Sequence, residues 1–260
     1  MSPAKNGDGP RESDYSRQTV RGKGMRTGYT TGSCAAAATK AAVTALLTGT
    51  PVANVTIHLP IGRDADFTLN RCEWTDRTPG EEKVLCSVIK DGGDDPDVTH
   101  GAEICATIFF ETNYKGGPAA EERVTIKGGV GIGTVTLPGT GIPVGEPSVT
   151  RVPRRMIIES ALEAAEAHGL ESGKSIIVEL SVPNGEEIAL KTTNARLGVL
   201  GGIAILGSTG VVQPYSTAAW RAWPDSAAHP KSCRKRWRRP VPAATSGRLP
   251  WPTINFRCSP

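Results

Sequence analysis

The residues best suited to chemistry crowd into one acidic stretch. Residues 90–101 read KDGGDDPDVTHG, in which four aspartates precede a threonine and a histidine. Neighbouring carboxylates repel one another, which shifts their pKa values and lets them exchange protons near neutrality. One interpretation therefore makes Asp95 or Asp97 an acid–base partner of His100. Two others stay open: aspartates that cap backbone N–H groups of a tight loop, and a calcium loop, although the EF-hand spacing is absent.

A second candidate site is a loop of glycines and hydroxyl residues in front of an alanine-rich segment. Residues 27–34 read TGYTTGSC, and the following eleven residues include seven alanines. Alanine has the highest helix propensity, Ser33 is a suitable N-cap, and Gly49 supplies a stop. The sequence therefore predicts a helix over residues 34–47.

The expected start of this helix carries no acidic residue in its first turn. Its N–H groups and the positive end of its dipole are then available to an anion, with Thr30, Thr31 and Ser33 as additional donors. Tight packing of an alanine-rich helix on a sheet is the equal alternative. Cys34 is either a thiolate activated by the helix N-terminus or a small buried thiol.

Two further stretches offer ligand contacts. Residues 207–210 read GSTG and follow an apolar run over 197–206, which predicts a buried strand ending in a glycine and hydroxyl turn. Such a turn suits a small anionic or nucleoside ligand, and a junction between a strand and a linker is the alternative. Arg154 and Arg155 suit a substrate that carries carboxylates, or else form a solvated helix face.

The remaining pattern places these stretches in an α+β fold, with a mostly antiparallel sheet and helices on one side. Partly alternating, β-branched runs bounded by turn residues predict strands over residues 52–59, 67–74, 83–89, 102–111, 123–126 and 176–182. A second helix is predicted over 153–168. An Asn-Gly turn at 184–185 predicts a hairpin whose second strand covers 187–192.

Composition limits the class of protein. A chain of 260 residues with 38% hydrophobic residues can form one large or two ordinary domains. Its six cysteines and four histidines lack ligand or disulfide spacing, so we expect no protein-bound metal and no disulfide framework. Residues 1–24 lack the apolar core of a secretion signal and predict a disordered leader, and no apolar run is long enough to span a bilayer. We therefore expect a cytoplasmic protein.

The composition changes near the C-terminus. Residues 215–260 hold nine Lys or Arg against one acidic residue and four of the five tryptophans, whereas residues 1–214 hold 21 basic and 25 acidic residues. Residues 214–260 are therefore predicted to be a disordered tail. Basic residues interleaved with tryptophan could bind nucleic acid. A shifted reading frame is the preferred explanation, in which case the tail has no selected function and no nucleic-acid partner is expected.

Four stretches, in this order, resemble the cobalt-precorrin-5B C1-methyltransferase family of anaerobic cobalamin biosynthesis. They cover residues 28–38 (GYTTGSCAAAA), 90–101, 152–157 (VPRRMI) and 194–214 (NARLGVLGGIAILGSTGVVQP). The resemblance extends over about residues 25–222. It departs at Gly92, where the family commonly has alanine.

This resemblance implies a domain over residues 25–213 that uses S-adenosyl-L-methionine to methylate C1 of cobalt-precorrin-5B, a cobalt-containing tetrapyrrole. It implies catalytic roles for Asp95, Asp97 and His100. Implied substrate contacts are Tyr29, Thr30, Thr31, Ser33, Arg154 and Arg155. Implied cofactor contacts are Gly207, Ser208, Thr209 and Gly210.

In the family, a second α/β domain follows and holds much of the cofactor site. Because the resemblance stops near Ala222, we expect that domain to be missing through truncation or a frameshift. The methyltransferase activity is then weak or absent. Two alternatives follow, which are a non-catalytic remnant that binds the tetrapyrrole and, more distantly, a nucleic-acid binder that uses the basic tail.

Overall fold

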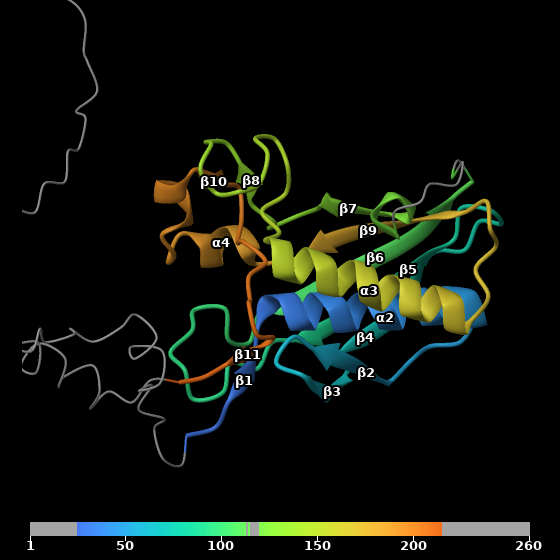
Figure 1. Ribbon diagram of the computed structural model, residues 1–260, viewed down its shortest axis with the longest axis horizontal. Helices are drawn as coiled ribbons and strands as arrows, with labels where there is room; N and C mark the ends of the chain where they lie inside the picture. Colours follow the sequence, from blue (N-terminus) through green and yellow to red (C-terminus); the bar gives the residue numbers. More distant parts are fainter. Residues whose placement is uncertain (1–24, 113, 115–119, 215–260) are drawn as a thin grey trace, which may run out of the picture. The chain divides into compact units, whose positions relative to one another are not determined.

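A computed structural model describes residues 25–112, 114 and 120–214 of the chain. The predicted leader and nearly all of the predicted tail lie outside these residues. The described part contains one central sheet, two long helices and several short strand pairs (Figure 1). The predicted α+β class is confirmed.

The central sheet has five strands in the order β4–β5–β6–β9–β7. Their bounds are β4 Arg71–Asp76, β5 Lys83–Ile89, β6 Glu103–Glu111, β7 Val124–Gly128 and β9 Ser175–Ser181. Neighbours are antiparallel except β7 and β9, which pair in parallel. Apolar residues of β6 and β9 fill the centre of the sheet, because these inner strands are covered by helices.

Two helices cover one face of this sheet side by side (Figure 1). They are α2, Thr31–Thr48, and α3, Arg151–Ala167. The alanines of α2 are fully buried, and their small side chains let the helix approach both the sheet and α3 closely. A Cβ atom at Gly32 would lie 2.7 Å from Cγ of Pro153, so the approach of the two helices at this point requires glycine.

Shorter elements complete the described part. A hairpin of β2 (Asn54–Leu59) and β3 (Arg63–Thr68) packs against α2. Two pairs join distant segments: β1 (Gly28–Tyr29) with β11 (Val211–Val212), and β8 (Thr134–Val135) with β10 (Val199–Leu200). The remaining short helices are η1 (Ala120–Arg123), α4 (Gly185–Ala189) and η2 (Asn194–Leu197). The β1–β11 pair places the start of α2 beside residues 206–212.

Several predicted boundaries are confirmed and two are wrong in detail. The strand over 83–89 is found as predicted, and Gly49 ends α2 in a left-handed conformation. The predicted strand over 67–74 is instead the end of β3 and the start of β4, because the chain turns between them. The cap of α2 is Thr30, whose hydroxyl accepts a hydrogen bond from the Ser33 amide at 3.2 Å, so the helix begins three residues earlier than predicted.

Two predicted strands are absent from the described residues. The region predicted as the second strand of a hairpin contains helix α4 instead. Glu186 and Glu187 lie in its first turn, where acidic residues stabilise the positive end of a helix. The apolar run over 197–206 forms only a 3-10 turn, the two-residue β10 and single bridges, because Gly198 and Gly201 adopt positive φ angles of 75° and 81° that interrupt the pleat.

No helix among the described residues is both long enough and apolar enough to cross a membrane. The same residues hold no cluster of three or more His, Cys, Asp or Glu side chains that could bind a metal ion.

Candidate functional site

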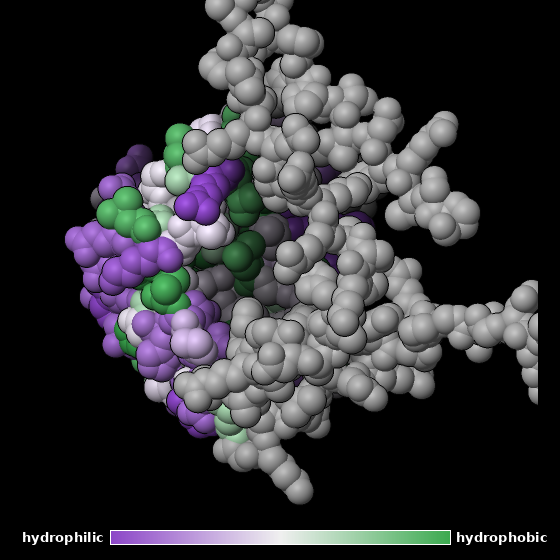
Figure 2. All heavy atoms as spheres, turned by 90° about the vertical axis from the view of Figure 1, so that its left-hand side faces the viewer, coloured by the Kyte–Doolittle hydropathy of each residue, from purple (hydrophilic) through white to green (hydrophobic). Residues whose placement is uncertain are grey.

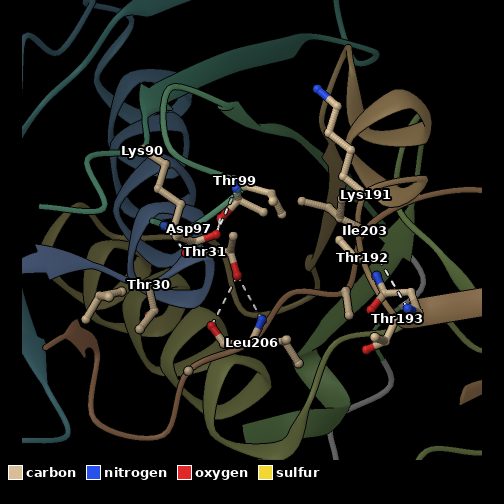
Figure 3. A pocket seen from close by; sticks show the side chains of 15 residues that line it. Thr30, Thr31, Lys90, Asp97, Thr99, Lys191, Thr192, Thr193, Ile203 and Leu206 are labelled. Atoms are coloured by element: carbon tan, nitrogen blue, oxygen red, sulfur yellow. Dashed lines mark hydrogen bonds and ion pairs between the residues drawn. The ribbon is translucent and has the colours of Figure 1, made fainter. Parts of the chain in front are cut away.

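A cavity of about 500 Å³ lies where four distant segments meet. It is within the size range of pockets for drug-sized ligands, roughly 300–1,000 Å³. Its polar lining residues are Thr30, Thr31, Lys90, Asp97, Thr99, Lys191, Thr192, Thr193 and Asn194, and its apolar and glycine lining residues are Val98, Ile203, Ala204, Leu206, Gly207 and Val212. Figure 3 shows these side chains, and Figure 2 looks onto this end of the molecule, where hydrophobic residues lie in a depression with hydrophilic residues around it.

Lys90 is the most unusual residue of this lining. It follows the last residue of β5, its side chain is 1% exposed, and its Nζ donates a 2.7 Å hydrogen bond to Oδ2 of Asp97. Lysine is almost never fully buried without a partner. The loop between them is closed by backbone hydrogen bonds that join Lys90 to Gly101 and Ala102. The acidic stretch is therefore folded around a buried cation.

The Asp97 carboxylate is held in place from both sides. Its second oxygen accepts hydrogen bonds from the amide and the hydroxyl of Thr99, at 2.8 and 2.7 Å. Burial opposes ionisation of Asp97, but the hydrogen bonds from Lys90 and Thr99 outweigh it and hold the pKa of Asp97 below its usual value. Burial and the charge of Asp97 raise the pKa of neighbouring Asp95. The two carboxyl groups thus differ in their readiness to ionise.

His100 does not pair with either of these aspartates. Its Nδ1 accepts a hydrogen bond from the Gly92 amide at 3.0 Å and lies 3.9 Å from the carboxylate of Asp91. The His100 side chain is 54% exposed and does not line the cavity. An arginine, Arg26, and the amide of Gly93 in turn hold the pKa of Asp91 at about 2.

The start of α2 is occupied by the protein itself. The amide of Gly32 donates to the carbonyl of Leu206 at 3.0 Å, and the hydroxyl of Ser33 donates to the carbonyl of Gly210 at 2.6 Å. Thr31 closes the same junction, because its hydroxyl both donates to Leu206 and accepts from the Leu206 amide (Figure 3). The expectation that these donors are free for an anion is wrong for Gly32 and Ser33. The first turn serves mainly to bind residues 206–210.

The opposite wall carries polar groups that the protein does not use. Residues 191–194, which follow α4 and end at the first residue of η2, read KTTN. The Thr192 hydroxyl is engaged with the carbonyl of Ala189 and the amide of Asn194. In the described part of the chain, the side chains of Lys191, Thr193 and Asn194 have neither a hydrogen-bond partner nor an ion-pair partner. Figure 3 shows this segment across the cavity from Lys90 and Asp97.

The predicted site residues fall into two groups. Thr30, Thr31, Asp97 and Gly207 line the cavity. The lining does not include Tyr29, Ser33, Asp95, His100, Arg154, Arg155, Ser208, Thr209 or Gly210.

The outlying residues have other contacts. The Tyr29 ring packs against Phe67 in a tilted arrangement with ring centroids 4.6 Å apart, and Arg154 lies 3.8 Å from Glu146. Arg155 lies 3.7 Å from Glu159 on the exposed side of α3. The structure therefore brings the acidic stretch, the N-terminal loop and the glycine turn together, but it keeps both arginines out of the cavity lining.

Sequence reasoning missed Lys90, Thr99 and residues 191–194. A lysine directly after an apolar strand predicts a buried ammonium group only when an acidic partner is known to lie beside it. The cluster KTTN was interpreted as a strand end, although its short polar residues are typical of a loop.

The structure decides between the two interpretations of Cys34 and shows a contact between two other cysteines. Cys34 is fully buried, and burial raises the pKa of its thiol to about 12, so the interpretation as a small buried thiol is confirmed. Cys72 and Cys86 lie opposite each other on β4 and β5 with their sulfur atoms 2.9 Å apart. This cross-strand pair escaped the search for close spacing because it is distant in sequence.

The geometry defines what the cavity can do chemically. Its apolar wall and its polar groups suit a ligand with a flat, partly apolar body and charged or polar ends. Lys90 holds a carboxylate ionised, and residues 191–194 offer unused donors. An ionised carboxylate, a buried cation and an apolar wall therefore share one pocket.

The chain is similar to known proteins over most of its length. The family model CbiD matches residues 18–214. A curated relative from Geobacillus sp. (strain WCH70), named cobalt-precorrin-5B C(1)-methyltransferase, is 51% identical over 200 residues, which cover 77% of this chain and 51% of the relative. A relative of the same name from Salinispora arenicola is 49% identical over 213 residues, which cover 82% of this chain and 52% of the relative.

One solved structure is similar as well. The crystal structure of the cobalamin biosynthesis protein CbiD from Archaeoglobus fulgidus is 31% identical with a TM-score of 0.56, and the match covers 76% of this chain and 57% of that one. The chain thus spans about half the length of the curated relatives it matches. Because the family model covers most of the chain, the chain belongs to the CbiD family.

Proposed function

We propose that this chain binds cobalt-precorrin-5B and S-adenosylmethionine in the cavity and promotes methyl transfer to C1 of the tetrapyrrole. The reaction is inferred from the relatives named cobalt-precorrin-5B C(1)-methyltransferase. One observation supports placing the reaction in this cavity. Three stretches that are far apart in the sequence, the N-terminal loop, the acidic stretch and residues 194–214, each contribute to its lining.

The residues present fit such ligands. The wall of Val98, Ile203 and Leu206 can contact the apolar face of a macrocycle or an adenine ring. Gly207 lines the cavity beside this wall, so among residues 207–210 it is the one placed for the proposed cofactor contact. When bound, S-adenosylmethionine supplies an electrophilic methyl group. The protein must then align donor and acceptor and exclude water.

Asp97 is the carboxylate placed at the cavity. Lys90 and Thr99 fix it there, and its lowered pKa keeps it ionised at neutral pH. Such a carboxylate can stabilise positive charge on a bound ligand, whereas its lowered pKa makes it a weak proton acceptor at neutral pH. Because the reaction consumes S-adenosylmethionine, a cytoplasmic metabolite, a cytoplasmic location is part of the same proposal.

The test is methyl transfer from labelled S-adenosylmethionine to cobalt-precorrin-5B, together with equilibrium binding of each ligand. We expect binding of both ligands and a small yield of labelled tetrapyrrole, in keeping with the weak activity expected from the sequence, and we expect the label to be lost in Asp97→Ala. Tetrapyrrole binding without any affinity for S-adenosylmethionine would assign the chain a binding function only. Failure to bind either ligand would refute the proposal.

A further inference from the structure

The charges around the cavity favour an anionic ligand group. Two lining residues, Lys90 and Lys191, are cationic and one, Asp97, is anionic. Asp95 lies near this pair but outside the lining. The lining therefore keeps one positive charge in excess after the Lys90–Asp97 pair is formed.

Lys90 has unused hydrogen-bonding capacity. An ammonium group carries three N–H donors. Among the residues that the structure describes, Asp97 is the one acceptor of a hydrogen bond from Lys90. A buried donor without an acceptor is costly, so a ligand oxygen that reaches Lys90 recovers free energy.

The facing wall supplies donors of the same kind. Lys191 and Asn194 carry three and two side-chain N–H donors, and Thr193 adds a hydroxyl. None of these groups is engaged within the described part of the chain. By contrast, the threonines on the α2 side, Thr30 and Thr31, are hydrogen-bonded to the protein itself. Ligand recognition at this cavity therefore falls to Lys90 and to residues 191–194.

We propose that the cavity binds carboxylate groups of its ligand at Lys90 and at the facing segment 191–194. A carboxylate presents two oxygens that accept several hydrogen bonds at once, which matches the ammonium, amide and hydroxyl donors on these two walls. The inference rests on the proposed function, which names two molecules that could supply the carboxylate. They are the tetrapyrrole, through a carboxylate side chain, and S-adenosylmethionine, through its amino-acid end. It assigns binding roles to Lys191, Thr193 and Asn194.

A first experiment tests the carboxylate site without nucleotide or tetrapyrrole. Tricarballylate, a small tricarboxylate, and its neutral triamide are titrated at matched ionic strength against the full chain and its variants, with thermal unfolding as the readout. The variants are Lys191→Met, the double variant Lys90→Met with Asp97→Asn, and a control. The control Lys127→Met removes a half-exposed charge from β7, outside the lining.

Tricarballylate at ten times its Kd should raise the Tm of the wild type and of the control by about 3 °C or more. Lys191→Met and the double variant should weaken this binding about tenfold or more. The triamide should have no effect on any of the proteins. An equal response of all four proteins, an equal response to the triamide, or no response at all would overturn the carboxylate site.

A second experiment identifies the source. S-adenosylhomocysteine is compared with methylthioadenosine, which lacks the amino-acid carboxylate, and cobyrinic acid is compared with cobinamide, in which carboxamides replace the carboxylates. If Lys191→Met weakens only S-adenosylhomocysteine, the carboxylate belongs to the cofactor, and if it weakens only cobyrinic acid, it belongs to the tetrapyrrole. A positive first experiment with no binding of these four probes would refute the proposed function and keep the carboxylate site. Normal probe binding with a negative first experiment would refute the carboxylate site alone.

Discussion

At the scale of single residues, the site depends on an ion pair that joins the start of the loop between β5 and β6 to its middle. Lys90 and Asp97 form an ion pair whose cation is buried and whose anion is three-quarters covered, with exposed fractions of 1% and 25%. Removing one partner of a buried pair leaves an uncompensated charge, which costs far more than the pair contributes. The loop conformation and the charge of the cavity are therefore coupled.

Asp97→Asn should lower the free energy of unfolding by about 3 kcal/mol, because it leaves the buried Lys90 ammonium without its anionic partner. Urea unfolding measures this loss. Asp95→Asn is the matched control. It should be neutral or slightly stabilising, since burial and the charge of Asp97 disfavour the ionised form of the Asp95 carboxyl. Equal stability of the wild type and Asp97→Asn would contradict the account of this pair.

The same carboxylate predicts a pH dependence of stability. The folded-state pKa of Asp97 is lowered. A depressed pKa stabilises the fold above the pKa of the unfolded chain, which is about 3.9 for Asp, and the stabilisation is lost as pH falls through the folded-state value. The stability difference between the wild type and Asp97→Asn should be constant above about pH 5 and shrink below about pH 4. A difference that persists unchanged in strong acid would rule this mechanism out.

Thiol reactivity should follow the surroundings of each cysteine. A hydrogen bond from Cys86 outweighs partial burial and lowers the pKa of Cys72 to about 6, whereas burial raises the pKa of Cys34 to about 12. Iodoacetamide at neutral pH should therefore label Cys72 in the folded protein and Cys34 only after unfolding. Peptide mass spectrometry measures both sites in one sample, and rapid labelling of Cys34 in the folded state would contradict its burial.

At the scale of elements, periodic segments were predictable and glycine-rich segments were not. The alanine-rich helix and the strand over 83–89 have strong local preferences that agree with their tertiary surroundings. The segment 197–206 is as apolar as a strand, but Gly198 and Gly201 adopt positive φ angles, and Gly202 lies against the backbone of Gly131, a contact that no local pattern records. The turn at 184–185 is typical of a hairpin, yet two glutamates after it favour helix α4.

The candidate site shows the same limit of sequence reasoning. Thr30, Thr31, Asp97 and Gly207 were predicted by residue type, and all four line the cavity. Lys90 was not predicted, because its burial depends on the packing of α2 and on a loop that returns to it. Residues 191–194 line the cavity only because α4 replaces the predicted strand.

Two neighbouring glycines in the loop between β5 and β6 are expected to respond in opposite ways to substitution by alanine. A Cβ atom at Gly92 would lie 3.5 Å from its nearest neighbours, including Nζ of Lys90, which is ordinary contact. Gly92→Ala should therefore raise the free energy of unfolding by about 0.4–1 kcal/mol by restricting the unfolded chain.

Gly93 is the matched comparison, because it has a φ of 67° and its Cβ would lie 2.6 Å from the amide nitrogen of Gly28. Gly93→Ala should lower the free energy of unfolding by more than about 1 kcal/mol. Urea unfolding of both variants tests the loop conformation. Similar effects of the two substitutions would show that the loop is not folded as described.

At the scale of the whole molecule, the cavity is a product of topology. The pairing of β1 with β11 and the return of residues 203–207 to the start of α2 bring together segments that are far apart in sequence. No single segment holds the apolar wall, the buried cation and the unused donors. This explains why the family resemblance, which depends on short ordered stretches, includes only part of the cavity lining.

The central claim is that this cavity is the ligand site of the chain. A crystal structure of the chain with S-adenosylhomocysteine and a cobalt tetrapyrrole tests it most directly. The account predicts ligand density against the apolar wall, with carboxylate groups in hydrogen-bond reach of Lys90 and of Lys191 or Asn194. Well-ordered ligand elsewhere on the protein, with only water beside Lys90 and Asp97, would contradict it.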